Sequence, residues 1–140
     1  MIGRLAAWTL AGVLLATGVA KLLDQPAFGT ALASVGLLPP VAARVLVLIL
    51  PWIEVVTAVA LLRPTWRRAG ALVALVLSLG FVGYSCLGAW LQRPPTCGCF
   101  GKTRLVTGWI QHAIVAAAMV GAAIMAWRAT PSPSSPPATA

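Results

Sequence analysis

The chain has 140 residues, of which 60% are hydrophobic and only 9% are charged. Because a soluble domain usually carries about 25% charged residues, this composition excludes an ordinary soluble protein and predicts a polytopic membrane protein. The net charge of +8 arises from ten Lys and Arg residues against Asp24 and Glu54. The basic residues lie at the ends of apolar runs and form no stripe interleaved with aromatic residues, which argues against nucleic-acid binding.

Four apolar runs are long enough to cross a bilayer, which takes about 20 helical residues. They predict an all-α, integral membrane four-helix bundle over residues 1–128, with spans at about 5–23, 41–62, 67–90 and 105–127. A signal peptide is the alternative for the first run, with a cleavage site at Gly18-Val19-Ala20. We favour a retained helix, because the run is longer than most signal sequences and continues as Lys21-Leu22-Leu23.

The segment between the first two runs predicts a short helix at the membrane interface. Asp24-Gln25-Pro26 should end the first span, since proline disfavours helix in the residue before it. Residues 27–38 are too few to cross the membrane, and they alternate large apolar residues with small ones. Pro39-Pro40 then separates this helix from the second span.

Two spans carry small residues at intervals of four, which places each set on one helical face. We expect these faces to allow close helix contact. They comprise Gly12, Ala16 and Ala20 in the first span and Ala113, Ala117 and Gly121 in the fourth.

Glu54 is the only acidic residue inside a predicted span, and an unpaired charge there would be expensive. Its candidate partners are Lys21, Arg44 and His112, unless the carboxyl group stays protonated. Its position predicts a site near the middle of the membrane, apart from the cysteine loop. Lys21, in contrast, is expected at the membrane face where the cysteines lie.

Cys97-Gly98-Cys99, in a short polar segment before the fourth span, is the sharpest chemical signal. A disulfide between residues two apart is tight, and the glycine relieves the backbone. Strain makes such a bond easier to reduce, which suits thiol–disulfide exchange. Lys102 and Arg104 are close enough in sequence to stabilise a thiolate. The alternatives are an inert structural pair or a zinc site that also uses Cys86 and His112.

Cys86 and His112 lie in spans three and four, near the membrane face that carries the cysteine loop. A lone cysteine in a span is usually a small core residue, which we favour here, and a resolving thiol is the alternative. His112 is interpreted equally well as a hydrogen-bonded core residue or as a proton carrier beside the thiols.

The orientation follows from the basic residues and the even number of predicted spans. Five basic residues fall on each side of the membrane. The loop at 63–68 holds the densest cluster, and Asp24 lowers the net positive charge of the other side. We therefore expect both termini in the cytoplasm, which places Cys97 and Cys99 outside, where disulfides can form. The Pro- and Ser-rich tail, residues 129–140, is expected to be disordered.

The chain resembles the methylamine utilisation protein MauE family, within the wider DoxX-like group of four-helix membrane proteins. The resemblance covers about residues 4–127. The residues that carry it are Gly18-Val19-Ala20-Lys21-Leu22, Leu37-Leu38-Pro39, Leu50-Pro51-Trp52-Ile53-Glu54 and Cys97-Gly98-Cys99-Phe100-Gly101.

This resemblance implies a role in maturing a disulfide-rich extracytoplasmic dehydrogenase subunit, alongside a thioredoxin-like partner. By this resemblance, Cys97 and Cys99 would be the exchanging pair, at the outer face of the plasma membrane. Independently of the resemblance, the apolar helices beside the pair make a quinone in the bundle a candidate electron carrier. The sequence thus predicts a membrane thiol–disulfide exchange component. The alternative function is a non-enzymatic membrane scaffold or zinc-binding module that uses Cys97, Cys99, Cys86 and His112.

Overall fold

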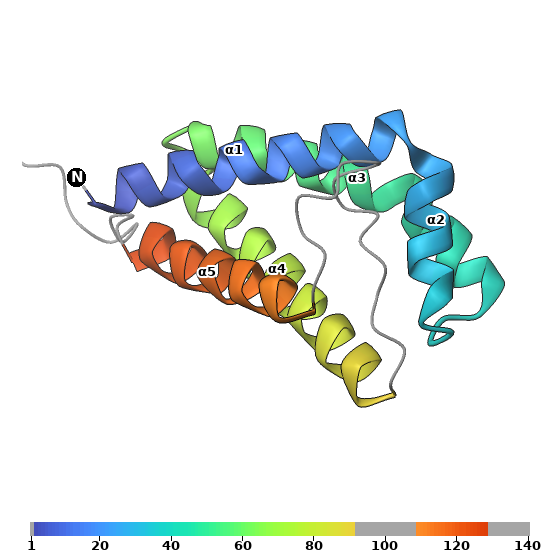
Figure 1. The fold of residues 1–140 in the computed structure, drawn as a ribbon. Helices are drawn as coiled ribbons and strands as arrows, with labels where there is room; N and C mark the ends of the chain where they lie inside the picture. Colours follow the sequence, from blue (N-terminus) through green and yellow to red (C-terminus); the bar gives the residue numbers. More distant parts are fainter. Residues whose placement is uncertain (1, 92–108, 129–140) are drawn as a thin grey trace, which may run out of the picture.

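The computed structural model describes residues 2–91 and 109–128, with side chains for 3–91 and 114–128. These residues form five helices and no strand, so the all-α prediction is confirmed for the described part of the chain (Figure 1). The helices are α1 (Ile2–Leu23), α2 (Gln25–Ser34), α3 (Pro40–Leu62), α4 (Arg67–Trp90) and α5 (Trp109–Arg128).

Three of the helices are long and apolar enough to cross a membrane. These spans are Gly3–Leu23, Pro40–Leu62 and Arg67–Trp90, while a shorter apolar helix covers Ile114–Arg128. The protein is therefore a multi-pass membrane protein that associates with the lipid bilayer. A fourth crossing by α5 stays a prediction.

The four longer helices contact one another in a closed ring. α1 packs against α3, α3 against α4, α4 against α5, and α5 returns to α1, while α2 packs mainly on α3 (Figure 1). Neighbours in the ring run antiparallel, so α1 and α4 begin at the end of the molecule where α3 and α5 finish.

A core of small apolar side chains joins the four longer helices at that end. Alanine dominates it, which lets the backbones approach closely, as is common between membrane helices. The core consists of Ala7, Leu10, Ala11, Leu14, Ala58, Leu61, Ala71, Ala74, Ala123 and Ala126.

The predicted contact faces at intervals of four are not the faces that pack most closely, although Ala20 and Gly121 are half-buried. Gly12, Ala16 and Ala117 are exposed, and a Cβ added at Gly12 or Gly121 would meet nothing within 4 Å. The faces of α1 and α5 that pack into the core lie beside these residues and include Ala11, Leu14, Ala123 and Ala126. Membrane helices are apolar on every side, so small-residue spacing alone does not identify the side that meets a neighbour.

The short helix predicted before the second span is present as α2. The Asp24 carboxylate accepts a hydrogen bond from the Ala27 N–H (3.2 Å) and caps its start. The helix ends at Ser34 rather than Leu38, because Gly36 adopts a left-handed conformation (φ 69°). The Tyr84 hydroxyl of α4 lies 2.9 Å from the Leu32 carbonyl oxygen, one of the last acceptors of α2. Its location at the membrane interface stays a prediction.

Candidate functional site

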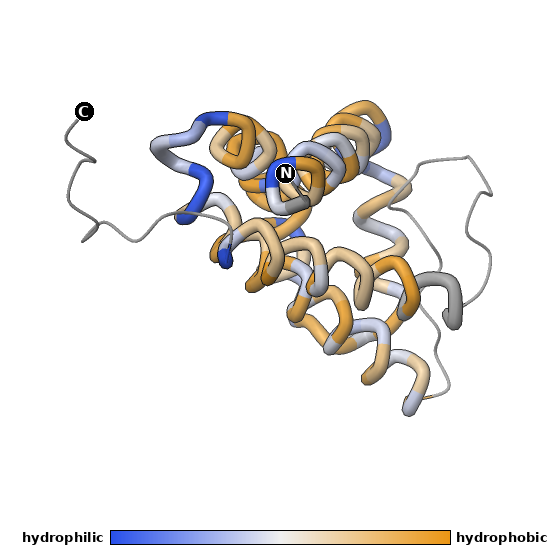
Figure 2. The backbone as a smooth tube through the Cα atoms, turned by 90° about the vertical axis from the view of Figure 1, so that its left-hand side faces the viewer, coloured by the Kyte–Doolittle hydropathy of each residue, from blue (hydrophilic) through white to orange (hydrophobic). Residues whose placement is uncertain are grey.

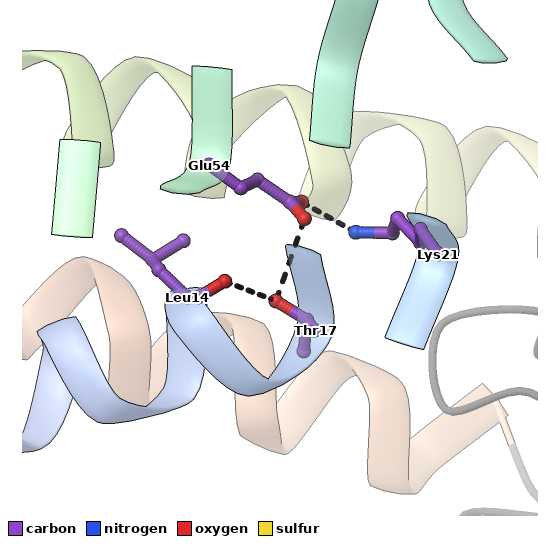
Figure 3. Close-up of polar contacts among 4 residues, drawn as sticks. All are labelled: Leu14, Thr17, Lys21 and Glu54. Carbon is purple, nitrogen blue, oxygen red and sulfur yellow. Dashed lines mark hydrogen bonds and ion pairs between the residues drawn. The ribbon is translucent and has the colours of Figure 1, made fainter. Parts of the chain in front are cut away.

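Lys21 of α1 and Glu54 of α3 form an ion pair inside the helix ring (Figure 3). The Lys21 ammonium group donates a hydrogen bond to Glu54 Oε1, and the two side chains are only 5% and 10% exposed. Burial of either charge alone would be costly, so each requires the other. Within the part of the chain that the structure describes, this is the one salt bridge.

Thr17 completes the site and was not predicted from the sequence. Its hydroxyl lies 3.5 Å from Glu54 Oε2 and 3.2 Å from the Leu14 carbonyl oxygen (Figure 3). Thr17 and Lys21 are four residues apart and share one face of α1. This four-residue spacing could have identified Thr17 from the sequence, because a polar residue one turn before an intramembrane lysine faces the same neighbouring helix.

The local geometry of α1 explains how Lys21 reaches Glu54. Helical side chains lean toward the N-terminus, so Lys21, near the end of α1, extends back toward Thr17 and into the ring. Gly18 lies between them, and a Cβ there would be 3.1 Å from the Pro51 carbonyl oxygen and 3.2 Å from Glu54 Cβ. The missing side chain therefore allows α1 and α3 to approach at the level of the ion pair.

The short helix α2 covers the charged pair. The Lys21 ammonium nitrogen lies 5.4 Å from the centroid of the Phe28 ring, and Phe28 is itself buried. A cation over an aromatic face is attracted by the ring quadrupole, more so when water is excluded. Lys21 thus links three helices: its own, α3 through Glu54, and α2 through Phe28.

The structure confirms Lys21 as the partner of Glu54 and corrects the predicted difference in their depths. Lys21 was assigned to the membrane face with the cysteines and Glu54 to a deeper site, but their side chains form one buried site. The error arose because the expected depths were those of the backbone, whereas a long lysine side chain reaches well beyond the level of its own backbone toward the helix N-terminus. Of the other candidate partners, Arg44 is exposed.

Cys86 is a free, exposed cysteine on α4, so its interpretation as a small core residue is wrong. The neighbouring Ser85 takes the inward position instead and is 3% exposed. Among the described residues, the hydroxyl of Ser85 has no hydrogen-bond partner, whereas the inward-facing Ser78 donates to the Ala74 carbonyl oxygen (2.7 Å).

The side chains of the remaining predicted site residues lie outside the described part of the structure. Cys97, Cys99, Lys102 and Arg104 lie outside the described residues, and His112 is described by its backbone in α5. Among described side chains, no group of three or more His, Cys, Asp and Glu residues could hold a metal ion. The exchanging pair and the zinc alternative therefore both remain predictions.

The depth of His112 follows from the pairing of α4 with α5. The Arg68 guanidinium lies 5.4 Å from the Trp127 ring, and the two helices run antiparallel from there. His112 precedes Trp127 by 15 residues, and Gly83 follows Arg68 by 15. Equal helical rise therefore puts the His112 backbone about level with Gly83, within a turn of Cys86.

A comparison with protein families identifies the whole helical region. The family model for methylamine utilisation protein MauE matches residues 1–129. The chain belongs to this family. No curated protein and no solved structure gives a match. The resemblance inferred from the sequence is thereby confirmed, and the protein is a methylamine-utilisation-associated, multi-pass membrane protein.

The MauE match covers both the buried site and the cysteine segment. Residues 1–129 include Lys21 and Glu54 as well as Cys97 and Cys99. The family assignment therefore applies to the segment that joins α4 to α5, although the structure describes only the helices on either side of it.

Proposed function

We propose that this MauE-family protein is a membrane thiol–disulfide exchange component. Cys97 and Cys99 would exchange electrons with a thioredoxin-like protein outside the cytoplasm, and so support disulfide formation in a client such as a dehydrogenase subunit. The single observation that carries this proposal is the Cys97-Gly98-Cys99 pair within the segment that matches the MauE family.

The chemistry is a two-step exchange that conserves electrons. A thiolate of one partner attacks a sulfur of the other partner's disulfide, forms a mixed disulfide and releases a thiolate. The second thiol of the attacking pair then resolves the mixed disulfide, so one pair is oxidised as the other is reduced. Lys102 and Arg104 follow the pair closely in sequence, and their positive charge favours the thiolate.

The proposed topology has four spans, with α5 as the fourth, in the plasma membrane. The closed ring of contacts supports this, because α5 packs against both α1 and α4 along the bundle. Four spans place both termini on one side, and the arginine-rich turn between α3 and α4 favours the cytoplasm for that side. The cysteine pair then faces an oxidising compartment.

The buried site has a positioning role in this proposal. Lys21, Thr17 and Glu54 fasten α1 to α3, and Phe28 fastens α2 over them. The site lies in the half of the bundle toward which α4 runs before it leads into the cysteine segment. A rigid frame there would keep the membrane end of that segment in a constant position.

A redox titration of the Cys86→Ser variant tests the exchange function. With Cys86 removed, Cys97 and Cys99 are the only thiols in the chain. We expect one two-electron transition between dithiol and disulfide in glutathione buffers, with no bound zinc by elemental analysis. Stoichiometric zinc with both thiols reduced throughout the titration would contradict the proposal and favour the zinc-binding alternative.

A further inference from the structure

Five arginines gather where α1 and α4 begin and α3 and α5 end. Arg63 follows the last residue of α3, Arg67 and Arg68 open α4, and Arg128 closes α5. Arg4 lies one turn before Ala7, whose side chain belongs to the core shared with the other three helix ends. Figure 2 looks toward the N-terminus and the hydrophilic turn between α3 and α4. We call these five residues the basic end.

No acidic side chain of the chain neutralises the basic end. The sequence contains two acidic residues only. Glu54 is paired with Lys21, and Asp24 caps α2 at the far end of α1. Because neither acidic side chain lies at the basic end, the five positive charges are available to counter-charges from outside the helices.

Arg67 and Arg68 are held in place by contacts that leave most of their guanidinium N–H groups able to bind a ligand. The Arg67 Nε–H donates to the Leu61 carbonyl oxygen (3.2 Å), which occupies one of its five N–H groups. The Arg68 guanidinium lies 5.4 Å from the Trp127 ring centroid. Both side chains are half-buried, whereas Arg4, Arg63 and Arg128 are exposed. Fixed guanidinium groups lose less entropy when they bind an oxyanion.

The surroundings of the basic end place it at the level of lipid headgroups. Trp66 and Trp127 are 59% and 38% exposed, and exposed tryptophans at the ends of membrane helices are typical of that level. Trp66 also makes no side-chain cap for α4, so the first N–H groups of that helix add positive partial charge.

We infer that the basic end binds the phosphate group of an anionic phospholipid. The Arg67 guanidinium, on the α3 side of α4, would donate its remaining N–H groups to the phosphate oxygens, since arginine matches this geometry with paired N–H groups. Arg68, on the α5 side of α4, would add a second fixed positive charge. The three exposed arginines would add longer-range attraction. The acyl chains would lie along the apolar outer faces of α3 and α4, whose exposed residues include Val59, Leu62, Leu72 and Val73.

Native mass spectrometry of the detergent-solubilised full chain tests this inference. Titration with phosphatidylglycerol should give bound lipid at concentrations at least tenfold lower than phosphatidylcholine does, since each nearby basic residue strengthens binding to anionic lipid severalfold. The double variant Arg67→Gln/Arg68→Gln should remove that preference. The matched control is Arg44→Gln, an exposed arginine in the first turns of α3, which should keep it.

A second variant protects the test against misfolding, because Arg67 also satisfies a backbone carbonyl of α3. Arg4→Gln/Arg63→Gln/Arg128→Gln changes exposed side chains only and should weaken phosphatidylglycerol binding severalfold without loss of thermal stability. Equal binding of the two lipids, or the same loss in Arg44→Gln as in the basic-end variants, would overturn the inference. Full competition by inorganic phosphate at equal concentration would also overturn it and indicate a soluble anion as the ligand.

Discussion

Lys21 and Glu54 are separated by 33 residues in the sequence, yet they form the buried ion pair that joins α1 to α3. The pair lies beside Gly18, where α1 closely approaches Pro51 and Glu54 of α3, and α2 covers the pair through Phe28. Since both charged side chains are almost fully buried, each requires the other, and the pair fixes how three helices are arranged.

Removal of one charge should therefore harm the fold more than removal of both. Lys21→Met or Glu54→Gln alone should lower the free energy of unfolding by about 3–5 kcal/mol, because each leaves an unpaired buried group. The double variant Lys21→Met/Glu54→Gln should recover most of this loss. Unfolding in mixed detergent micelles gives the coupling energy through a double-mutant cycle. Additive effects of the two substitutions would contradict the structural pairing.

Glycine should be required at position 18 and not at position 12. Gly18→Ala puts a methyl group about 3.1 Å from the Pro51 carbonyl oxygen and should cost about 1–3 kcal/mol of stability. Gly12→Ala is the matched control in the same helix, because its methyl group meets nothing within 4 Å. There, the higher helix propensity of alanine should stabilise the protein slightly. Thermal unfolding of both variants measures the difference, and equal shifts would argue against the close approach.

Tyr84→Phe should loosen the end of α2 and leave the rest of the bundle intact. The substitution removes the hydroxyl that lies 2.9 Å from the Leu32 carbonyl oxygen, at a cost of about 1 kcal/mol. Amide hydrogen exchange should accelerate over the last turn of α2 and through Gly36, while exchange in α1 stays unchanged. Unchanged exchange at the end of α2 would show that the hydroxyl does not hold it.

Cys86 should tolerate substitution and react without unfolding. Because its side chain is exposed on α4, Cys86→Ser should change the free energy of unfolding by no more than about 0.5 kcal/mol. A membrane-permeant maleimide should label Cys86 in the folded protein of a Cys97→Ser/Cys99→Ser background. Ser85→Cys in a cysteine-free background is the matched control, since that position is buried and should label slowly.

Much of the fold was predictable because the apolar runs and their breakers are strong signals. The bounds of α3 and α4 follow the second and third runs almost to the residue, and Asp24 and Pro26 mark the junction of α1 and α2. The end of α2 was harder to predict. It depends on Gly36 and on a hydroxyl from α4, and the second of these is a contact far away in the sequence.

The candidate site was predictable in its residues but not in its pairing. Glu54 required a partner, and the sequence offered Lys21, Arg44 and His112 without a way to choose. The choice depends on which faces of α1 and α3 meet, and apolar helices give little rotational signal. The same lack of signal explains why Cys86 was placed inward while Ser85 occupies that position.

Capture of a mixed disulfide tests the proposed exchange function most directly. Cys97→Ser and Cys99→Ser, each in a Cys86→Ser background, retain a single thiol that can attack a partner disulfide but cannot resolve the product. One of the two variants should accumulate a reductant-sensitive adduct with an extracytoplasmic thioredoxin-like protein, and client maturation should fail in both. If neither variant forms an adduct and both still support maturation, the cysteine pair is not the exchanging site.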